Sequence, residues 1–409
     1  MHIDQRTAIP LLALVLAACT TEARTSPTAT PTRITPTVPS PTPTPPTSTP
    51  LPRSTAQTRT PLPALAPAEW TLGPDEAWIT LDVYCDFQAV GCAALSPLLD
   101  ALLERHPDDL RLVYHQYPLI TINDKASLAA QAAEAAGAQG MFWEFSDALY
   151  GNWADWVSLP PEDFPAWLVA FAEDLDLDAQ RFEQDLESGA FAEIVEVAHQ
   201  RIVISGIMSV PVVYLNADLV QLDLNLNNLE AAIRLEALSA IEYESEPPML
   251  IDLEASYQAT LHLDQGEIVI ELYPASAPMA VNSFVFLAGE GWLDGAIFHR
   301  VLPGVLAETG DPSGTGLGGP GYFFATELDP SLDFGEAGAV AMSSAGMGTN
   351  GSQFFISLAP LPQFNGSRTI FGQVLSGLEI LQALPRRDPL FNLLNPAGVT
   401  ILSVTIEER

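Results

Sequence analysis

The sequence predicts a multidomain chain in which an α/β domain is followed by a closed antiparallel β-barrel with two capping helices. Three observations predict this fold class. The chain has 409 residues, 48% of them hydrophobic, which is enough for two or three domains with sizeable cores. Its middle part alternates strand-like and helical segments around a cysteine-bearing turn. Its C-terminal part carries many short strand-like runs and two helical ones.

The charge of the chain is strongly acidic. Lys and Arg number 16 against 51 Asp and Glu, so the net charge is −35. This charge argues against nucleic acid or an anionic lipid surface as a partner. Three cysteines are too few for a disulfide framework, and the six histidines show no metal-ligand spacing. We therefore expect no nucleic-acid partner, no metal and no cofactor.

The first 19 residues have the pattern of an export signal. An apolar run at 9–18 is too short to span a bilayer as a helix, and it has the size of a signal-peptide core. The run ends in Leu16-Ala17-Ala18-Cys19, which resembles the lipobox of bacterial lipoproteins. That resemblance implies lipidation of Cys19, and hence a protein anchored to the cell membrane and facing the extracytoplasmic side. The alternative is an ordinary signal peptide whose cysteine is incidental.

Residues 20–67 form a linker that consists almost entirely of Thr, Pro, Ser and Ala. Proline at this density excludes helices and sheet ladders and favours extended polyproline II. At roughly 3.1 Å per residue such a segment reaches on the order of 100 Å or more. We predict a disordered stalk without chemistry of its own.

Residues 68–245 alternate between strand and helix patterns. A strand is expected at 78–84, a helix at 93–105, a second strand at 110–117, helical segments over 125–191 and a last strand entered at Pro211. Between the first strand and the first helix, the turn 85–92 carries Cys85 and Cys92.

This order resembles the DsbA-like branch of the thioredoxin superfamily, in which the turn carries Cys-x-x-Cys and a cis-proline loop lies against it. The resemblance places the nucleophilic cysteine of that family on Ala89, the resolving cysteine on Cys92 and the loop proline on Pro211. Thiol–disulfide exchange needs an exposed thiolate at the helix N-terminus, and alanine cannot supply one. We predict a degenerate thiol site in a structural or substrate-binding module, and no oxidoreductase activity.

Cys85 and Cys92 could still pair with each other, because they are close in sequence and the expected compartment is oxidising. A strand end and a helix start do not guarantee the Cβ geometry that a bond requires. We expect two buried thiols, with a Cys85–Cys92 disulfide as the alternative.

Residues 255–409 show short strand patterns around two helices. The runs 257–263 and 266–273 alternate apolar and polar residues around Asp264-Gln265 and predict a β-hairpin. Helices are expected at 277–288 and 377–384. Further strands are expected at 296–302, 337–342, 353–358, 369–374 and 399–407.

Several motifs in this region occur in the order found in cyclophilins, especially the bacterial type. They are Phe298-His299-Arg300-Val301-Leu302-Pro303-Gly304, the glycine-rich loop 310–321, Thr349-Asn350-Gly351-Ser352-Gln353-Phe354-Phe355-Ile356 and Phe371-Gly372-Gln373-Val374. The region resembles that family over about 150 residues. The resemblance implies peptidyl-prolyl cis-trans isomerisation, a reaction that needs an apolar slot and a donor for the twisted amide rather than a nucleophile or metal.

The resemblance also implies a set of site residues. Arg300 matches the catalytic arginine, Gln353 the glutamine that binds the substrate backbone, and Phe355 the floor of the proline pocket. The remaining positions predicted to bind substrate are Phe298, Val305, Leu306, Glu308, Ser343, Ser344, Phe364 and Arg368.

Four of these positions depart from the family pattern. Val305 replaces a phenylalanine, Glu308 a glutamine, Ser344 an asparagine and Arg368 a histidine. Two arrangements are open: Glu308 and Arg368 compensate each other, or Glu308 pairs with Arg300, occupies its donors and slows turnover. We expect activity to survive at a reduced rate.

The sequence thus predicts a lipid-anchored isomerase that assists folding of proline-containing or unfolded polypeptides outside the cytoplasm. The alternative is a non-catalytic peptide-binding chaperone or scaffold in which both active sites have degenerated.

Overall fold

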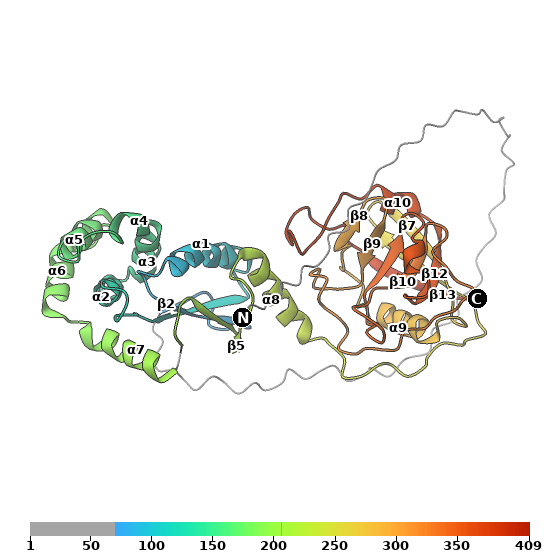
Figure 1. Ribbon diagram of the computed structural model, residues 1–409, viewed down its shortest axis with the longest axis horizontal. Coiled ribbons are helices and arrows are strands. Elements are labelled where there is room, and N and C mark those ends of the chain that lie inside the picture. The colour runs from blue at the N-terminus through green and yellow to red at the C-terminus, as the bar shows by residue number, and fades with distance from the viewer. Residues whose placement is uncertain (1–69, 206) are drawn as a thin grey trace, which may run out of the picture. The chain divides into compact units, whose positions relative to one another are not determined.

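The computed structural model describes residues 70–205 and 207–409, and the predicted signal peptide, Cys19 and the whole of the predicted linker lie outside this range. The N-terminal domain contains a five-stranded sheet in the order β1-β3-β2-β4-β5, of which Figure 1 labels β2 and β5. Its strands are β1 (Trp70–Leu72), β2 (Ile79–Cys85), β3 (Leu110–Gln116), β4 (Val212–Leu215) and β5 (Asp218–Leu219). β2 and β3 run parallel, and helix α1 (Val90–Arg105) connects them; the other pairs are antiparallel.

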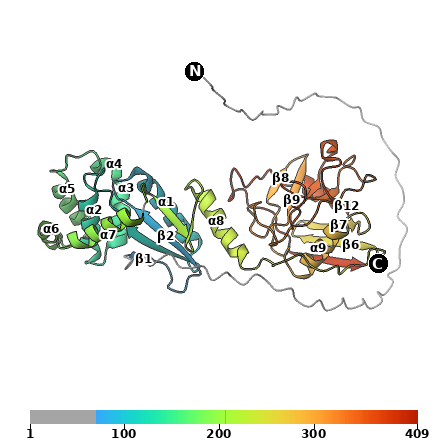
Figure 2. The same cartoon turned by 60° about the horizontal axis from the view of Figure 1, so that its bottom comes forward.

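Apolar alternation explains β2, because Ile79, Leu81 and Val83 point into the core and each is at most 1% exposed. Between β3 and β4 the chain forms a run of helices. These are α2 (Ala126–Gly137), α3 (Phe142–Gly151), α4 (Trp153–Trp156), α5 (Phe164–Asp174), α6 (Ala179–Ser188) and α7 (Ala192–Ser205). Helices α2 to α6 gather at one end of the sheet (Figure 2). Helix α8 (Leu226–Ser239), which the sequence analysis did not predict, follows β5.

The C-terminal domain contains an eight-stranded sheet in the order β13-β6-β7-β12-β10-β11-β9-β8, and every pair in it is antiparallel. The strands are β6 (Tyr257–Leu263), β7 (Gly266–Leu272), β8 (Arg300–Leu302), β9 (Leu306–Thr309), β10 (Ala339–Met342), β11 (Phe354–Ser357), β12 (Ile370–Ser376) and β13 (Ser403–Glu408). The predicted hairpin is present as β6 and β7, whereas β9 was not predicted.

The prediction of a closed barrel goes further than the structure does. The sheet is a curled half-barrel whose edge strands are β8 and β13. Residues next to those edges do meet, because Gly295 N donates to Ile401 O at 2.8 Å and Phe298 N donates to Val399 O at 2.9 Å. These contacts, together with an isolated bridge between Ile297 and Thr400, join short segments outside the strands and add no ladder between the edges.

Two helices accompany this sheet close to the predicted positions: α9 (Pro278–Gly289) and α10 (Leu378–Gln382). Pro278 is the first residue of α9, where its missing N–H costs no hydrogen bond. Val281, Phe284 and Leu287 of α9 and Leu381 of α10 are buried in the interior cluster of the half-barrel. Tyr243 and Ile251, which precede β6, belong to the same cluster.

The two faces of the sheet carry separate apolar clusters. On β11, Phe354 and Ile356 belong to the interior cluster, whereas Phe355 belongs to a second cluster on the opposite face. β10 follows the same alternation, with Val340 in the interior cluster and Ala341 in the second. The second cluster, which we call the outer cluster, comprises Leu306, Phe334, Ala339, Ala341, Phe355, Leu361 and Ile370, with Tyr273, Leu302, Val305, Leu332 and Phe364 packed against it.

Candidate functional site

Arg300, Glu308 and Phe355 form a row across three neighbouring strands. Arg300 on β8 is paired with Glu308 on β9, and Glu308 is paired in turn with Phe355 on β11. Directly opposed residues of antiparallel strands point to the same side of a sheet. The row therefore places a guanidinium, a carboxylate and an aromatic ring on one face, although they are far apart in the sequence.

The apolar part of this face is built on aromatic packing. The ring of Phe355 lies parallel to that of Phe334, with centroids 5.8 Å apart. Phe364 meets Phe355 edge-on at 5.7 Å. Leu306 belongs to the same cluster, and Val305 packs against it, as predicted for residues of one apolar surface.

Arg300 lies between two carboxylates. Its Nη1 donates to Glu308 Oε2 at 3.3 Å, and its Nε is 3.7 Å from Asp388 Oδ2. The Nε atom is buried without a hydrogen-bond partner, although the side chain as a whole is 38% exposed. Among the residues that the structure describes, none accepts a hydrogen bond from Nη2. That group remains available to a bound peptide.

Glu308 pairs with Arg300 and not with Arg368. The Glu308 side chain is 9% exposed, and the Ser343 hydroxyl donates to its second oxygen. Arg368 instead donates from Nη1 to the carbonyl and the hydroxyl of Ser344, at 2.6 and 2.7 Å. Of the two arrangements that the sequence left open, the structure has the Glu308–Arg300 pair. Compensation between Glu308 and Arg368 is therefore wrong.

Gln353 lies two residues before Phe355 and is held in place by the glycine-rich loop. Its Nε2 donates to Gly318 O at 2.7 Å, which leaves Oε1 as an acceptor. The loop is organised by Asp311, which is fully buried and accepts hydrogen bonds from Ser313, Thr315, Gly316 N and Gly318 N. Asp311 was not among the site residues predicted from the sequence.

Phe298 is not part of this face. It is 0% exposed and belongs to the interior cluster, so it cannot contact a bound peptide and its predicted role as a substrate-binding residue is wrong. Strand alternation would place Phe298 and Arg300 on the same face, but the regular β8 ladder begins only at Arg300, so the alternation does not extend back to Phe298. Burial lowers the pKa of His299, so its imidazole stays neutral near pH 7.

Asp388 was also missed from the sequence. It follows Arg387, whose backbone pairs with that of Val301 as an isolated bridge at the free edge of β8. Residues 385–398 show no periodic pattern, so nothing in the sequence indicated that they reach the edge strand of the site.

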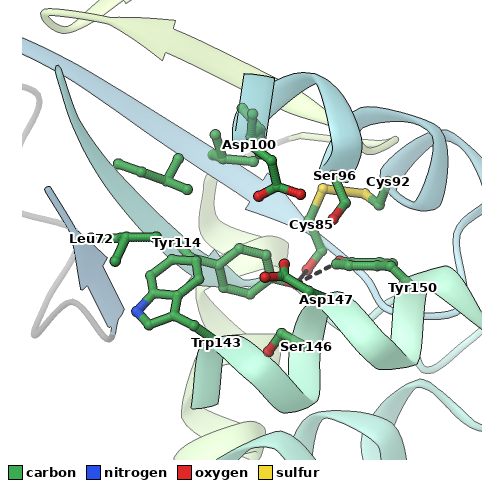
Figure 3. Close-up of a pocket in the computed structure, with 13 residues that line it drawn as sticks. Leu72, Cys85, Cys92, Ser96, Asp100, Tyr114, Trp143, Ser146, Asp147 and Tyr150 are labelled. Carbon is green, nitrogen blue, oxygen red and sulfur yellow. Dashed lines mark hydrogen bonds between the residues drawn. A yellow bond between two sulfur atoms is a disulfide. The ribbon is translucent and has the colours of Figure 1, made fainter. Parts of the chain in front are cut away.

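The thiol site of the N-terminal domain contains a disulfide. Cys85, at the end of β2, is bonded to Cys92 in the first turn of α1, with Cα atoms 5.7 Å apart (Figure 3). Our expectation of two free buried thiols is therefore wrong. The spacing of the two cysteines in the sequence did not show that the sharp turn after β2 brings the start of α1 back over the end of the strand. Both cysteines are at most 2% exposed.

Ala89 and Pro211 lie where the resemblance placed them. Ala89 is the N-cap residue of α1. The Val210–Pro211 bond is cis, and a Cβ added to Gly91 would come within 2.7 Å of Pro211 Cδ. The proline loop therefore packs against the helix start, and the helix N-terminus presents a methyl group in place of a thiol.

A small pocket beside the disulfide carries two carboxylates, those of Asp100 and Asp147, together with Ser96 (Figure 3). Burial, then the charges of Asp100 and Glu144, raise the pKa of Asp147 to about 6. Burial and the charge of Glu104 raise the pKa of Asp100.

In the described residues, no group of three or more His, Cys, Asp or Glu side chains could hold a metal ion. Across the same ranges, no helix combines the length and apolar character needed to cross a membrane.

Comparisons with known proteins agree with the two domains. Residues 258–405 match the family model described as cyclophilin type peptidyl-prolyl cis-trans isomerase/CLD, and residues 66–234 match the model described as thioredoxin. The chain is 48% identical over 125 residues to peptidyl-prolyl cis-trans isomerase B of Bacillus subtilis (strain 168), covering 31% of this chain and 87% of that protein.

A second relative is peptidyl-prolyl cis-trans isomerase A of Mycobacterium tuberculosis (strain ATCC 25618 / H37Rv), 40% identical over 169 residues, covering 37% of this chain and 93% of that protein. Among solved structures, a cyclophilin type peptidyl-prolyl cis-trans isomerase of Cryptosporidium parvum matches with a TM-score of 0.35 and 30% identity, covering 38% of this chain and 99% of that one.

Proposed function

Because the chain belongs to the family of cyclophilin-type peptidyl-prolyl cis-trans isomerases, we propose that Arg300 catalyses isomerisation of X-Pro bonds held on the outer cluster. The observation that carries the proposal is the cross-strand row, in which the guanidinium of Arg300 and the ring of Phe355 stand on one face of the sheet with Glu308 between them. A proline ring packed on Phe355, Leu306 and Phe364 would bring its amide nitrogen towards the arginine.

The chemistry follows from the electronic structure of the amide. Rotation about an X-Pro bond has a barrier of about 18–20 kcal/mol because the planar amide is stabilised by resonance. In the twisted state the prolyl nitrogen regains a lone pair and becomes a hydrogen-bond acceptor. Arg300 is permanently charged, and its free Nη2 can donate to that nitrogen more strongly in the twisted than in the planar state. The reaction requires no covalent step.

Gln353 supplies a second contact with the peptide in this proposal, in addition to that of Arg300. With Nε2 engaged by Gly318 O, its Oε1 can accept a backbone N–H from the peptide. This contact would hold the chain on one side of the proline while the other side rotates. Ser344 has less capacity to do so, because Arg368 already binds its carbonyl oxygen.

A protease-coupled assay with a proline peptide tests this function on the full chain. We expect a rate above the buffer blank, and a loss of about 100-fold or more in kcat/KM for Arg300→Ala, the usual effect of removing a donor that stabilises a transition state. Arg386→Ala is the matched control, because Arg386 is an exposed arginine on the following loop. Equal losses in both variants would exclude a specific role for Arg300.

The second candidate is a peptide-binding chaperone or scaffold without turnover. The Arg300–Glu308 pair favours it, because a full negative charge competes with the substrate amide for the guanidinium. A wild-type rate equal to the blank, together with measurable binding of the proline peptide, would select this candidate.

For the N-terminal domain we propose a structural or substrate-binding role without thiol exchange. Ala89 replaces the nucleophile, and the Cys85–Cys92 bond occupies the remaining thiol. An insulin-reduction assay should show no activity.

We also propose that the protein acts outside the cytoplasm, on proline-containing or unfolded polypeptides, from a lipid anchor at Cys19. The support is the sequence Leu16-Ala17-Ala18-Cys19 after an apolar run. Metabolic labelling with a radioactive fatty acid tests it: the wild-type chain should take up label and sediment with membranes, and Cys19→Ser should do neither. An unlabelled wild-type chain would exclude the anchor.

A further inference from the structure

The loop that begins at Arg387 is fixed to the free edge of β8. The backbone groups of Arg387 and Val301 exchange two hydrogen bonds, at 2.8 and 3.0 Å. In an antiparallel pair of this kind, the residue after Arg387 stands next to the residue before Val301. Asp388 is therefore the cross-strand neighbour of Arg300 on one side, as Glu308 is on the other.

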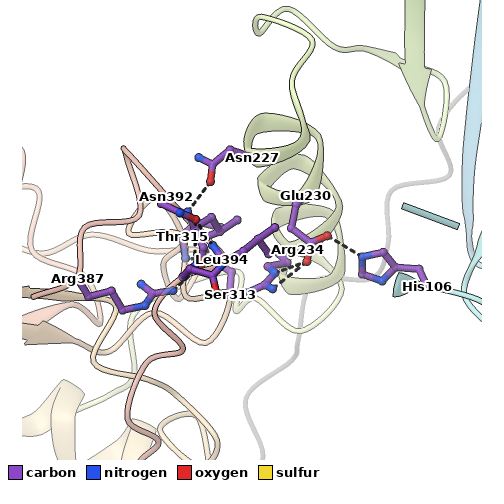
Figure 4. A network of polar contacts seen from close by, with 11 residues as sticks. His106, Asn227, Glu230, Arg234, Ser313, Thr315, Arg387, Asn392 and Leu394 are labelled. Atoms are coloured by element: carbon purple, nitrogen blue, oxygen red, sulfur yellow. Dashed lines mark hydrogen bonds and ion pairs between the residues drawn. The ribbon is translucent and has the colours of Figure 1, made fainter. Parts of the chain in front are cut away.

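The Arg387 side chain holds this register. It is 3% exposed, and its guanidinium donates to three backbone carbonyls, those of His299, Leu393 and Pro396. Figure 4 labels the Arg387 side chain within a network of polar contacts. One of these carbonyls belongs to the residue directly before Arg300. Because the buried cation ties both ends of the loop to the strand, the position of Asp388 beside Arg300 is determined by the fold.

The carboxylate of Asp388 is positioned to attract the guanidinium of Arg300. The Asp388 side chain is 10% exposed, so water screens its charge weakly. One oxygen accepts from Leu390 N at 3.3 Å, and the other lies 3.7 Å from Arg300 Nε. This Nε is the buried atom that has no hydrogen-bond partner.

The carboxylates of Glu308 and Asp388 attract different nitrogen atoms of the Arg300 guanidinium, from opposite sides of β8. Carboxylates prefer to bind arginine through two parallel hydrogen bonds, which would take up Nη1 of Arg300 together with a second nitrogen. Glu308 makes only one such bond here. The attraction of Asp388 for Nε opposes rotation of the guanidinium into a two-bond pair with Glu308.

We propose that Asp388 is a positioning residue that counterbalances Glu308 and so keeps the Nη2 group of Arg300 free for the substrate amide. This inference rests on the proposed isomerase function. In this proposal the residue that offsets the effect of Glu308 on Arg300 is Asp388, a second carboxylate on the other side of β8. Arg368 does not have this role.

A double-mutant cycle tests the proposal on the full chain. Asp388→Asn removes the charge but keeps an oxygen that can accept from Leu390 N, so the loop is preserved. In the wild-type background we expect kcat to fall by about fivefold, with KM changed less than twofold, because Glu308 then captures Arg300. In the Glu308→Gln background, where no carboxylate competes, we expect Asp388→Asn to change kcat by less than about twofold.

The smaller effect of Asp388→Asn that we expect in the Glu308→Gln background separates a positioning role of Asp388 from a structural one. If Asp388 only stabilised the loop, Asp388→Asn would cost the same factor in both backgrounds, and that result would overturn the proposal. Asp264→Asn, in the exposed turn between β6 and β7, is the matched control and should leave kcat unchanged in either background.

A second measurement does not depend on turnover. In protein labelled with ¹⁵Nε-arginine, the Nε resonance assigned to Arg300 by its loss in Arg300→Lys should shift in Asp388→Asn and not in Asp264→Asn. An unshifted resonance would overturn the proposal even in an active enzyme. A shifted resonance in a protein with no wild-type activity would uphold the placement of Asp388 while the isomerase function itself failed.

Discussion

Arg300 and Glu308 face each other directly across the β8–β9 pair, with Nη1 of the guanidinium 3.3 Å from Oε2 of the carboxylate. Removing the negative charge of Glu308 should therefore weaken its hold on the Arg300 guanidinium. We predict that Glu308→Gln raises kcat/KM for a neutral proline peptide by about threefold, because a neutral amide oxygen still orients the guanidinium but competes with the substrate less strongly. The protease-coupled assay measures this. Glu254→Gln, an exposed carboxylate before β6, serves as the control, and a lower rate in Glu308→Gln would show that the charge assists catalysis.

The ring of Phe355 should contribute to both binding and folding. It is 3% exposed and packs between Phe334 and Phe364. Phe355→Ala should reduce the free energy of unfolding by about 3–5 kcal/mol and should raise KM in any folded fraction. Denaturant unfolding and steady-state kinetics measure the two effects. Phe323→Ala, which removes a ring that is 68% exposed, should change neither; an unaltered KM in Phe355→Ala would place the proline elsewhere.

The disulfide of the N-terminal domain predicts the outcome of a thiol titration. The chain has three cysteines, so the variant Cys19→Ser retains only the pair Cys85 and Cys92. After unfolding without reductant, this variant should show no reactive thiols, and two reactive thiols would contradict the bond. Replacing both cysteines by alanine should lower the free energy of unfolding by about 2.5 kcal/mol, the loop-closure contribution for a short loop.

Asp147 should make the stability of the N-terminal domain depend on pH. Burial, followed by the charges of Asp100 and Glu144, raises its pKa from 3.8 to about 6, so between these values the folded state binds more protons than the unfolded state. Stability from this group is present in full below about pH 4 and is lost as pH rises towards 6. Because the residue is exposed to solvent by its surface area, screening reduces the size of the effect.

Tryptophan fluorescence can follow this loss, because six of the seven tryptophans (70, 78, 143, 153, 156 and 167) lie in the N-terminal domain. In the wild type the thermal unfolding midpoint should decrease as pH rises from 4 to 6. In Asp147→Asn the fall should be smaller, whereas in Asp155→Asn it should match that of the wild type. A wild-type slope retained in Asp147→Asn would assign the pH dependence to another group.

The sequence by itself determined the two fold types and most of the elements that carry the site. Strand and helix periodicity depends on neighbours in the chain, so β2, β6, β7, α1 and α9 could be predicted from local pattern alone. The motif residues Arg300, Gln353 and Phe355 could be identified in the same way, since each belongs to a contiguous string. The short strand β9 could not, because four buried residues show no alternation.

The pairing of charges was decided by the tertiary structure. Arg300 could have paired with several partners, and the choice of Glu308 follows from strand register, which is a relation between segments and is not written in either one. For the same reason Asp388 was invisible in the sequence, since an aperiodic loop brings it to the edge of β8. Phe298 and the Cys85–Cys92 bond were misjudged because burial and Cβ geometry depend on how the chain turns, not on its spacing.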